Sequence, residues 1–153
     1  MDLFLVQHGE ARPELEDPER SLTDRGEETV RKVAAWAARA GLRVDQIRHS
    51  GKRRAEQTAA ILADSLRPIQ GMVAATGLAP NDDVKPVAEA LRTEPGSIML
   101  VGHLPFLSRL LSLLVAGNAE AEIVRFQQGG IVCLSSQEGK WSVNWAVPPD
   151  RLS

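Results

Sequence analysis

The sequence predicts an α/β fold with a mostly parallel central sheet. Short apolar runs alternate with segments of helical periodicity through the first two-thirds of the 153 residues, an order typical of strands joined by helical crossovers. Two of these runs, Leu3–Val6 and Ile98–Val101, end within two residues of a histidine, His8 and His103 respectively. Ligands of such folds bind beyond the carboxyl ends of the parallel strands. Both imidazoles are therefore expected at one edge of the sheet.

The remaining elements follow from spacing and from capping residues. Thr23 is a typical N-cap, Gly41 is a typical C-cap, and a glycine-containing loop predicts a hairpin near the end of the chain. No repeat or linker divides the sequence, so residues 1–153 are expected to form a single domain. The expected elements are, in order, strand Leu3–Val6, a helix from Thr23 to Gly41, strand Val44–Ser50, helix Arg53–Leu66, strand Met72–Ala75, helix Val84–Leu91, strand Ile98–Val101, helix Leu104–Val115, and strands Ile131–Ser135 and Trp141–Val147.

Composition narrows the classes of partner and compartment. The formal net charge of −2 gives no overall attraction to nucleic acid or to an anionic membrane, so neither is an expected partner. No apolar stretch is long enough to cross a membrane and no signal peptide is visible, which predicts a cytoplasmic protein. The single cysteine, Cys133, lies in an apolar run and is expected to be a buried structural thiol.

The residues around the two histidines suit phosphoryl chemistry. Histidine can be oriented through one ring nitrogen while the other attacks phosphorus, and Gly9 would let a ligand approach the backbone. His103 precedes an apolar helix in whose first turn Pro105 is expected. The N–H groups at a helix start bind anions, and an adjacent imidazole would strengthen that site.

A basic segment, Ser50–Thr58, supplies a third candidate. A guanidinium offers a planar pair of donors that matches the oxygens of a phosphate. Arg53 and Arg54 are neighbours and cannot both face the same way on a helix, and spacing alone leaves open which of them faces the site.

Taken together, these segments resemble the histidine phosphatase superfamily and, within it, the short SixA-type phosphohistidine phosphatases. The resemblance implies a three-layer α/β/α fold of the phosphoglycerate mutase type. It implies His8 as the nucleophile, His103 as the second histidine of the pocket and Arg54 as a phosphate ligand. The matching segments are Gln7-His8-Gly9-Glu10, Leu22-Thr23, Arg53-Arg54-Ala55-Glu56-Gln57-Thr58 and Gly102-His103-Leu104-Pro105, in which Gln7, Gly9 and Leu104 are interpreted as substrate-binding.

One position departs from the family pattern, which is Arg-His-Gly where this chain has Gln7. Glutamine donates hydrogen bonds but carries no charge. Loss of a charge-assisted contact to a phosphoryl group costs about 1.5–3 kcal/mol, or roughly ten- to a hundredfold in rate. We therefore expect reduced activity rather than none.

The preferred hypothesis is a phosphatase that hydrolyses phosphohistidine on a protein through a covalent phospho-His8 intermediate, without metal or cofactor. Thr76–Pro80 offers no carboxylate as a general acid, and Asp82 and Asp83 are expected to be solvated loop residues. A phosphoramidate needs such an acid less than a phosphate ester does, because imidazole is a better leaving group than an alkoxide. Short connections leave little material for a lid, which suits a protein substrate.

Three alternatives stay open. The chain could be a degenerate member that binds a phosphorylated partner with little turnover, or a phosphatase of small phosphate esters. A metal site on His8 and His103 is disfavoured because no third ligand has a recognisable spacing. His49 is interpreted as a surface or partly buried residue rather than one at the pocket rim, and Glu10 is as consistent with lining the site as with facing water. Arg20 and Arg25 are in reach of a phosphate but are interpreted as surface residues in salt pairs.

Overall fold

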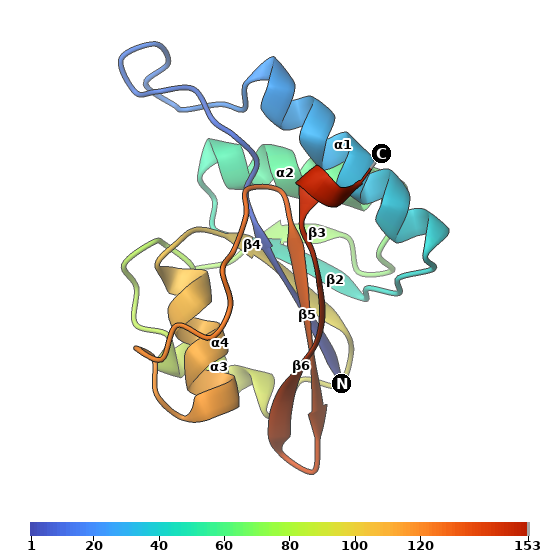
Figure 1. Cartoon of the computed structure of the whole chain (residues 1–153), viewed down its shortest axis with the longest axis vertical. Helices are drawn as coiled ribbons and strands as arrows, with labels where there is room; N and C mark the ends of the chain where they lie inside the picture. The colour runs from blue at the N-terminus through green and yellow to red at the C-terminus, as the bar shows by residue number, and fades with distance from the viewer. Residues whose placement is uncertain (153) are drawn as a thin grey trace.

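The computed structural model describes residues 1–152 and is built on one six-stranded sheet (Figure 1). The strand order is β3-β2-β4-β1-β5-β6; β1 to β4 run parallel, and β5 and β6 add an antiparallel hairpin. The predicted mostly parallel sheet is thus confirmed. The strands are β1 (Asp2–Gln7), β2 (Gln46–His49), β3 (Met72–Ala74), β4 (Ile98–Gly102), β5 (Ile131–Gln137) and β6 (Lys140–Val147).

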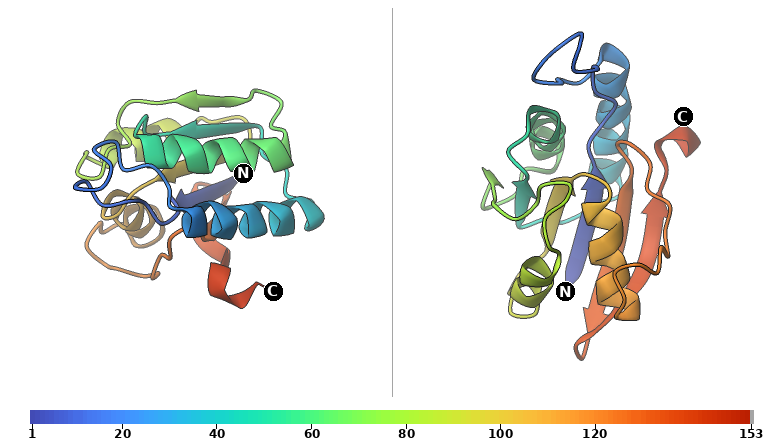
Figure 2. Two further views of the ribbon diagram at one scale, coloured as in Figure 1. Left: turned by 90° about the horizontal axis from the view of Figure 1, so that it is seen from above. Right: turned by 90° about the vertical axis from the view of Figure 1, so that its left-hand side faces the viewer.

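Helices cover both faces of the sheet, which confirms the three-layer α/β/α architecture (Figure 2). Along β1, Phe4 and Val6 pack with α1 and α2, whereas Leu3 and Leu5 pack with α3 and α4. This alternation follows from the two-residue period of a strand, and it makes an unbroken apolar run the pattern of a strand buried on both faces. The helices are α1 (Asp24–Arg39), α2 (Arg53–Leu66), α3 (Lys85–Leu91), α4 (Phe106–Ala116) and a 3₁₀ turn, η1 (Pro149–Arg151).

Local signals position most elements well. Thr23 caps α1 by accepting a hydrogen bond from the Gly26 N–H at 2.9 Å, as predicted. Helix α4 begins two residues later than expected, because Pro105 occupies its N-cap position instead of its first turn. The hairpin strands are longer than expected and are joined only by Glu138 and Gly139, both at positive φ. Tight hairpin turns take that backbone conformation.

The parallel strands end at a common edge, and this edge is where the site lies. Gln7 is paired with Gly102, and His49 is paired with Val101. The residues that follow β1, β2 and β4 are therefore neighbours, although about 50 residues separate each from the next in the chain. In the part of the chain that the structure describes, no helix combines the length and apolarity that a membrane crossing requires.

Candidate active site

The first residues beyond β1 and β4 are a histidine pair. The His8 N–H donates to the carbonyl of Gly102 at 3.0 Å, which continues the strand pairing by one bond. The ring centroids of His8 and His103 are 5.0 Å apart, with the ring planes inclined at 53°. Only 7% of His8 and 1% of His103 is exposed. The two imidazoles form a single, largely buried unit.

The orientation of His8 leaves one ring nitrogen free. Its Nδ1 lies 2.7 Å from the carbonyl oxygen of Gly9. A carbonyl can only accept, so Nδ1 carries the hydrogen and Nε2 carries the lone pair. Nε2 has no hydrogen-bond partner within residues 1–152. The lone pair of Nε2 is therefore not engaged by the protein.

Gly9 is required for packing against α1. A Cβ at this position would lie 2.8 Å from Val30 Cγ2 and 3.1 Å from the Gly26 carbonyl oxygen. The Gly9 N–H already donates to Thr58 Oγ1 at 3.0 Å. The small size of Gly9 thus admits α1, and its carbonyl orients His8; the expectation that a ligand approaches the Gly9 backbone stays a prediction. Thr58, fully buried on α2, holds this loop and was not predicted to do so.

The structure distinguishes the two neighbouring arginines of α2. Arg53 is exposed and pairs with Glu56, with Nη1 and Oε1 3.5 Å apart. Arg54 is half-buried, and its Nε is buried without a partner in the described residues. After burial, the charge of Arg54 contributes to lowering the pKa of both His8 and His103, so its guanidinium is close enough for its charge to act on the pair. Arg54 is thus the arginine that faces the site.

Both histidines are neutral at physiological pH. Burial, followed by repulsion from Arg54 and Arg20, lowers the pKa of His8 to about 4 against a hydrogen bond to Gly9 that raises it. Burial, followed by repulsion from His8, Arg54, Lys52 and Arg20, lowers the pKa of His103 to about 3. A neutral imidazole keeps the lone pair that a nucleophile needs.

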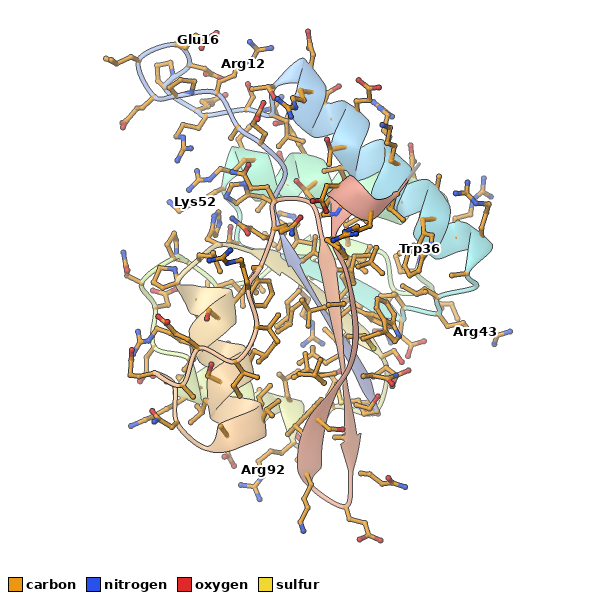
Figure 3. The ribbon with its side chains drawn as sticks, viewed as in Figure 1. Arg12, Glu16, Trp36, Arg43, Lys52 and Arg92 are labelled. Carbon is orange, nitrogen blue, oxygen red and sulfur yellow. The ribbon has the colours of Figure 1, made fainter. Side chains whose placement is uncertain are left out.

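Arg20 belongs to the electrostatic environment of the site and is half-buried, which favours the interpretation that it reaches toward the phosphate over a surface ion pair. It stands in the left-handed backbone region with φ of 51°, and its Nε donates to the Arg12 carbonyl at 3.2 Å. That hydrogen bond ties the Arg20 side chain to the backbone of the loop between β1 and α1. The loop projects beyond the sheet edge, where Figure 3 labels Arg12 and Glu16. The charge of Arg20 lowers the pKa of Arg54 as well as those of the histidines.

Comparison with known proteins identifies the family that this chain resembles. Residues 3–78 match the model of the histidine phosphatase superfamily (branch 1). Phosphohistidine phosphatase SixA of Escherichia coli K12 is 28% identical over 158 residues, which cover 99% of this chain and 96% of SixA. A structure of the protein histidine phosphatase SixA complexed with tungstate superposes with a TM-score of 0.87 at 28% identity, over 98% of both chains.

The chain belongs to the histidine phosphatase superfamily. Its similarity to SixA supports phosphatase activity, the hydrolysis of a phosphoryl group. An α-ribazole phosphatase from Shigella flexneri has a TM-score of 0.77 at 16% identity, over 94% of this chain and 95% of that one. At that identity the likeness shows a shared fold only.

In this histidine phosphatase, Gln7 stands at the position of the family's arginine and points inward. Gln7 Oε1 is buried and has no partner among residues 1–152. Three of the five such atoms belong to Gln7, Arg54 and His103, so unpaired buried polar groups gather at this edge. Leu104, interpreted as substrate-binding, is 40% exposed directly after His103.

The nearby carboxylates are engaged elsewhere. Glu10 Oε1 accepts a hydrogen bond from the Thr23 hydroxyl at 2.8 Å. Asp82 accepts from the Ala79 N–H at 2.9 Å, and Asp83 accepts from the Lys85 N–H at 3.0 Å. Asp82 and Asp83 therefore stabilise the loop before α3 and are not simply solvated.

Two further observations concern alternative sites. His49 was expected to be at the surface or partly buried, and it is almost fully buried, because it ends β2 between β3 and β4; its Nδ1 accepts from the Gly51 N–H at 3.1 Å. Within residues 1–152, no three His, Cys, Asp or Glu side chains are grouped to hold a metal ion. A cavity of about 530 Å³ lies between α1 and the C-terminal segment, and it is lined by residues such as Glu10, Lys32 and Asp150 rather than by the histidine pair.

Proposed function

We propose that this protein is a phosphohistidine phosphatase that works through a covalent phospho-His8 intermediate. The observation that carries the proposal is the hydrogen bond from His8 Nδ1 to the Gly9 carbonyl, since it leaves the lone pair of the neutral ring on Nε2. The lone pair of Nε2 attacks phosphorus while the P–N bond to the substrate imidazole breaks, and the departing imidazole nitrogen takes up a proton from solvent, which the hydrolysis step returns. Water then attacks the phosphoryl group on His8, releasing inorganic phosphate and restoring the neutral ring.

Two groups beside His8 are assigned to the phosphoryl oxygens. Arg54 presents a buried, unpaired Nε and keeps its charge at neutral pH, and His103 presents a buried, unpaired Nδ1. Charge that moves onto the equatorial oxygens during transfer is stabilised by donors already held in position. Every role is assigned to a side chain of this protein, and neither a metal nor a cofactor takes part.

The substrate class rests on the leaving group. Imidazole leaves far more readily than an alkoxide, so a phosphohistidine needs less help from a general acid. Glu10, Asp82 and Asp83 are held by hydrogen bonds to Thr23 and to the backbone, which makes each a poor candidate for that acid. Only three residues join β2 to α2 and β4 to α4, whereas the longer loop between β1 and α1 projects beyond the edge. The proposed substrate is a phosphorylated side chain presented by another protein in the cytoplasm.

The test is phosphate release from a matched panel. A phosphohistidine peptide and phosphoramidate should be hydrolysed faster than a phosphoserine peptide, in the presence of EDTA and in its absence. Brief exposure to labelled substrate should leave acid-labile, alkali-stable label on the wild type and none on His8→Ala. Equal background rates for the wild type and His8→Ala would refute the proposal.

Gln7 supports a second candidate function. An uncharged residue at the position of the family's arginine suits a domain that binds a phosphorylated partner and turns it over slowly. In that case inorganic phosphate or a phosphopeptide would raise the Tm without detectable hydrolysis. The panel above separates the two functions.

A further inference from the structure

Ser50 lies between the ends of β2 and β4 and contacts the second histidine. Because His49 is paired with Val101, the residue after His49 lies beside the segment that carries His103. Ser50 Oγ is 2.6 Å from His103 Nε2, and the same oxygen accepts the Lys52 N–H at 3.3 Å. Figure 3 labels Lys52, which directly precedes α2.

The donors and acceptors that join Lys52, Ser50 and His103 can be counted. A serine hydroxyl has one hydrogen to donate and two lone pairs that accept. The Lys52 N–H occupies one lone pair. If the second lone pair accepted from an Nε2–H of His103, the hydroxyl hydrogen would have no acceptor within residues 1–152, whereas donation to Nε2 pairs that hydrogen. In a neutral ring whose Nε2 accepts, the hydrogen must be on Nδ1.

We propose that Ser50 is a positioning residue that holds His103 as its Nδ1–H tautomer, so that this ring donates a hydrogen bond to a phosphoryl oxygen. Nδ1 of His103 is buried and has no partner in the described residues, and its ring lies 5.0 Å from that of His8. In the opposite tautomer the Nδ1 lone pair would face the phosphoryl oxygens and repel them. The benefit to turnover rests on the function proposed above, whereas the tautomer itself does not.

Nitrogen NMR of the full chain reads the tautomer directly. With ¹⁵N-labelled histidine near pH 7, Nδ1 of His103 should show a pyrrole-type shift and Nε2 a pyridine-type shift. Inorganic phosphate should move the Nδ1 resonance, and Ser50→Thr should reproduce the wild-type pattern. In Ser50→Ala the His103 tautomers should mix or reverse. A pyridine-type Nδ1 in the wild type, or an unchanged His103 spectrum in Ser50→Ala, would overturn the proposal.

Kinetics test the consequence for catalysis. Ser50→Ala should lower kcat by about 10- to 100-fold with a smaller change in KM, the usual scale for losing a group that orients an active-site ligand or donor. Ser50→Thr should recover kcat to within a fewfold. Ser135→Ala removes a hydroxyl that binds Asp2 at the opposite end of the sheet, and it should leave kcat unchanged.

Different results would refute the proposed phosphatase function and the proposed role of Ser50. A wild type without phosphatase activity but with a pyrrole-type Nδ1 that responds to inorganic phosphate would refute the catalytic function and support the role of Ser50. An active wild type whose kcat is unaffected by Ser50→Ala would refute the role of Ser50 alone. If Ser50→Ala does not fold, the spectra of the wild type and Ser50→Thr still decide the tautomer.

Discussion

His8 and His103 occupy equivalent places at neighbouring strand ends, yet different kinds of partner hold them. The ring of His8 is oriented by the carbonyl of the next residue, Gly9, whereas the ring of His103 is oriented by the hydroxyl of Ser50, 53 positions away. A backbone carbonyl is present whatever side chain follows. A side-chain hydroxyl can be removed by one substitution. The orientation of His8 is therefore intrinsic to its loop, and that of His103 depends on the packing of β2 beside β4.

This difference assigns the two rings different tasks. His8 exposes a lone pair at Nε2, which suits bond formation to phosphorus. His103 presents a buried nitrogen that suits hydrogen bonding to an oxyanion. A nucleophile cannot be replaced by solvent, but one of several oxyanion donors can be lost with some activity remaining.

The largest expected loss of activity comes from replacing either histidine by alanine. His8→Ala should reduce phosphate release from a phosphohistidine peptide by at least about 10³-fold, because the group that forms the covalent bond is gone. His103→Ala should reduce it by about 10²–10³-fold, because one donor to the developing charge is lost. Only His8→Ala should abolish the phosphoenzyme in a labelling experiment. A phosphoenzyme that survives His8→Ala but not His103→Ala would reverse the assignment.

The next largest loss of activity is expected at Arg54, whose charge acts on both rings. Arg54→Ala should lower kcat/KM by about 10²-fold, since a charge-assisted contact to a phosphoryl group is lost. Arg53→Ala is the matched control: its guanidinium is exposed and pairs with Glu56, so kcat/KM should change by less than about twofold. Equal losses in the two variants would show that the direction of Arg54 in α2 does not matter.

A smaller effect, of opposite sign, is expected at the residue before His8. Gln7→Arg should raise kcat/KM by about 10- to 100-fold, because it adds a charge-assisted contact of about 1.5–3 kcal/mol beside the phosphoryl group. Gln7→Met, which keeps the length but removes the N–H donors, should lower kcat/KM instead. If Gln7→Arg brings no gain, the present residue is not what limits the rate.

The features that the sequence could predict are local ones. The runs before His8 and His103 identified two buried strands, and capping and periodicity located α1 and the exact span of α2, Arg53–Leu66. A parallel α/β arrangement then placed both histidines at one edge of the sheet. These inferences need only neighbouring residues, because strand and helix periods are properties of short segments.

The features that were missed depend on which strands are adjacent. Ser50 has no signal of its own until β2 is known to lie beside β4, and Thr58 looked like one more residue on the buried face of α2. For Arg20 a surface ion pair was favoured over a reach toward phosphate, because nothing in the neighbouring sequence shows that its charge acts on the histidines. Strand order and loop path are set by the whole core, so the pattern of residues along the chain does not predict them.

The smallest expected effect compares the two rings through the pH dependence of stability. The folded pKa values, about 4 for His8 and about 3 for His103, lie below the ordinary value of 6.5. Their contribution to stability is therefore complete above about pH 7. It is lost as the pH falls through the window below 6.5, where the unfolded chain takes up protons that the folded chain does not. Each ring should contribute up to about 1.4 kcal/mol per pH unit to the slope of the unfolding free energy.

Urea unfolding of the wild type, His8→Asn and His103→Asn at several pH values between 7 and 4 measures this slope. Each substitution should make the dependence shallower by up to one proton, because asparagine does not titrate. The His8 contribution should level off near pH 4, whereas that of His103 should persist to lower pH, as its ring is buried more fully and is repelled by His8 as well as by Arg54. Slopes identical to the wild type in both variants would mean that neither ring is held neutral by the fold.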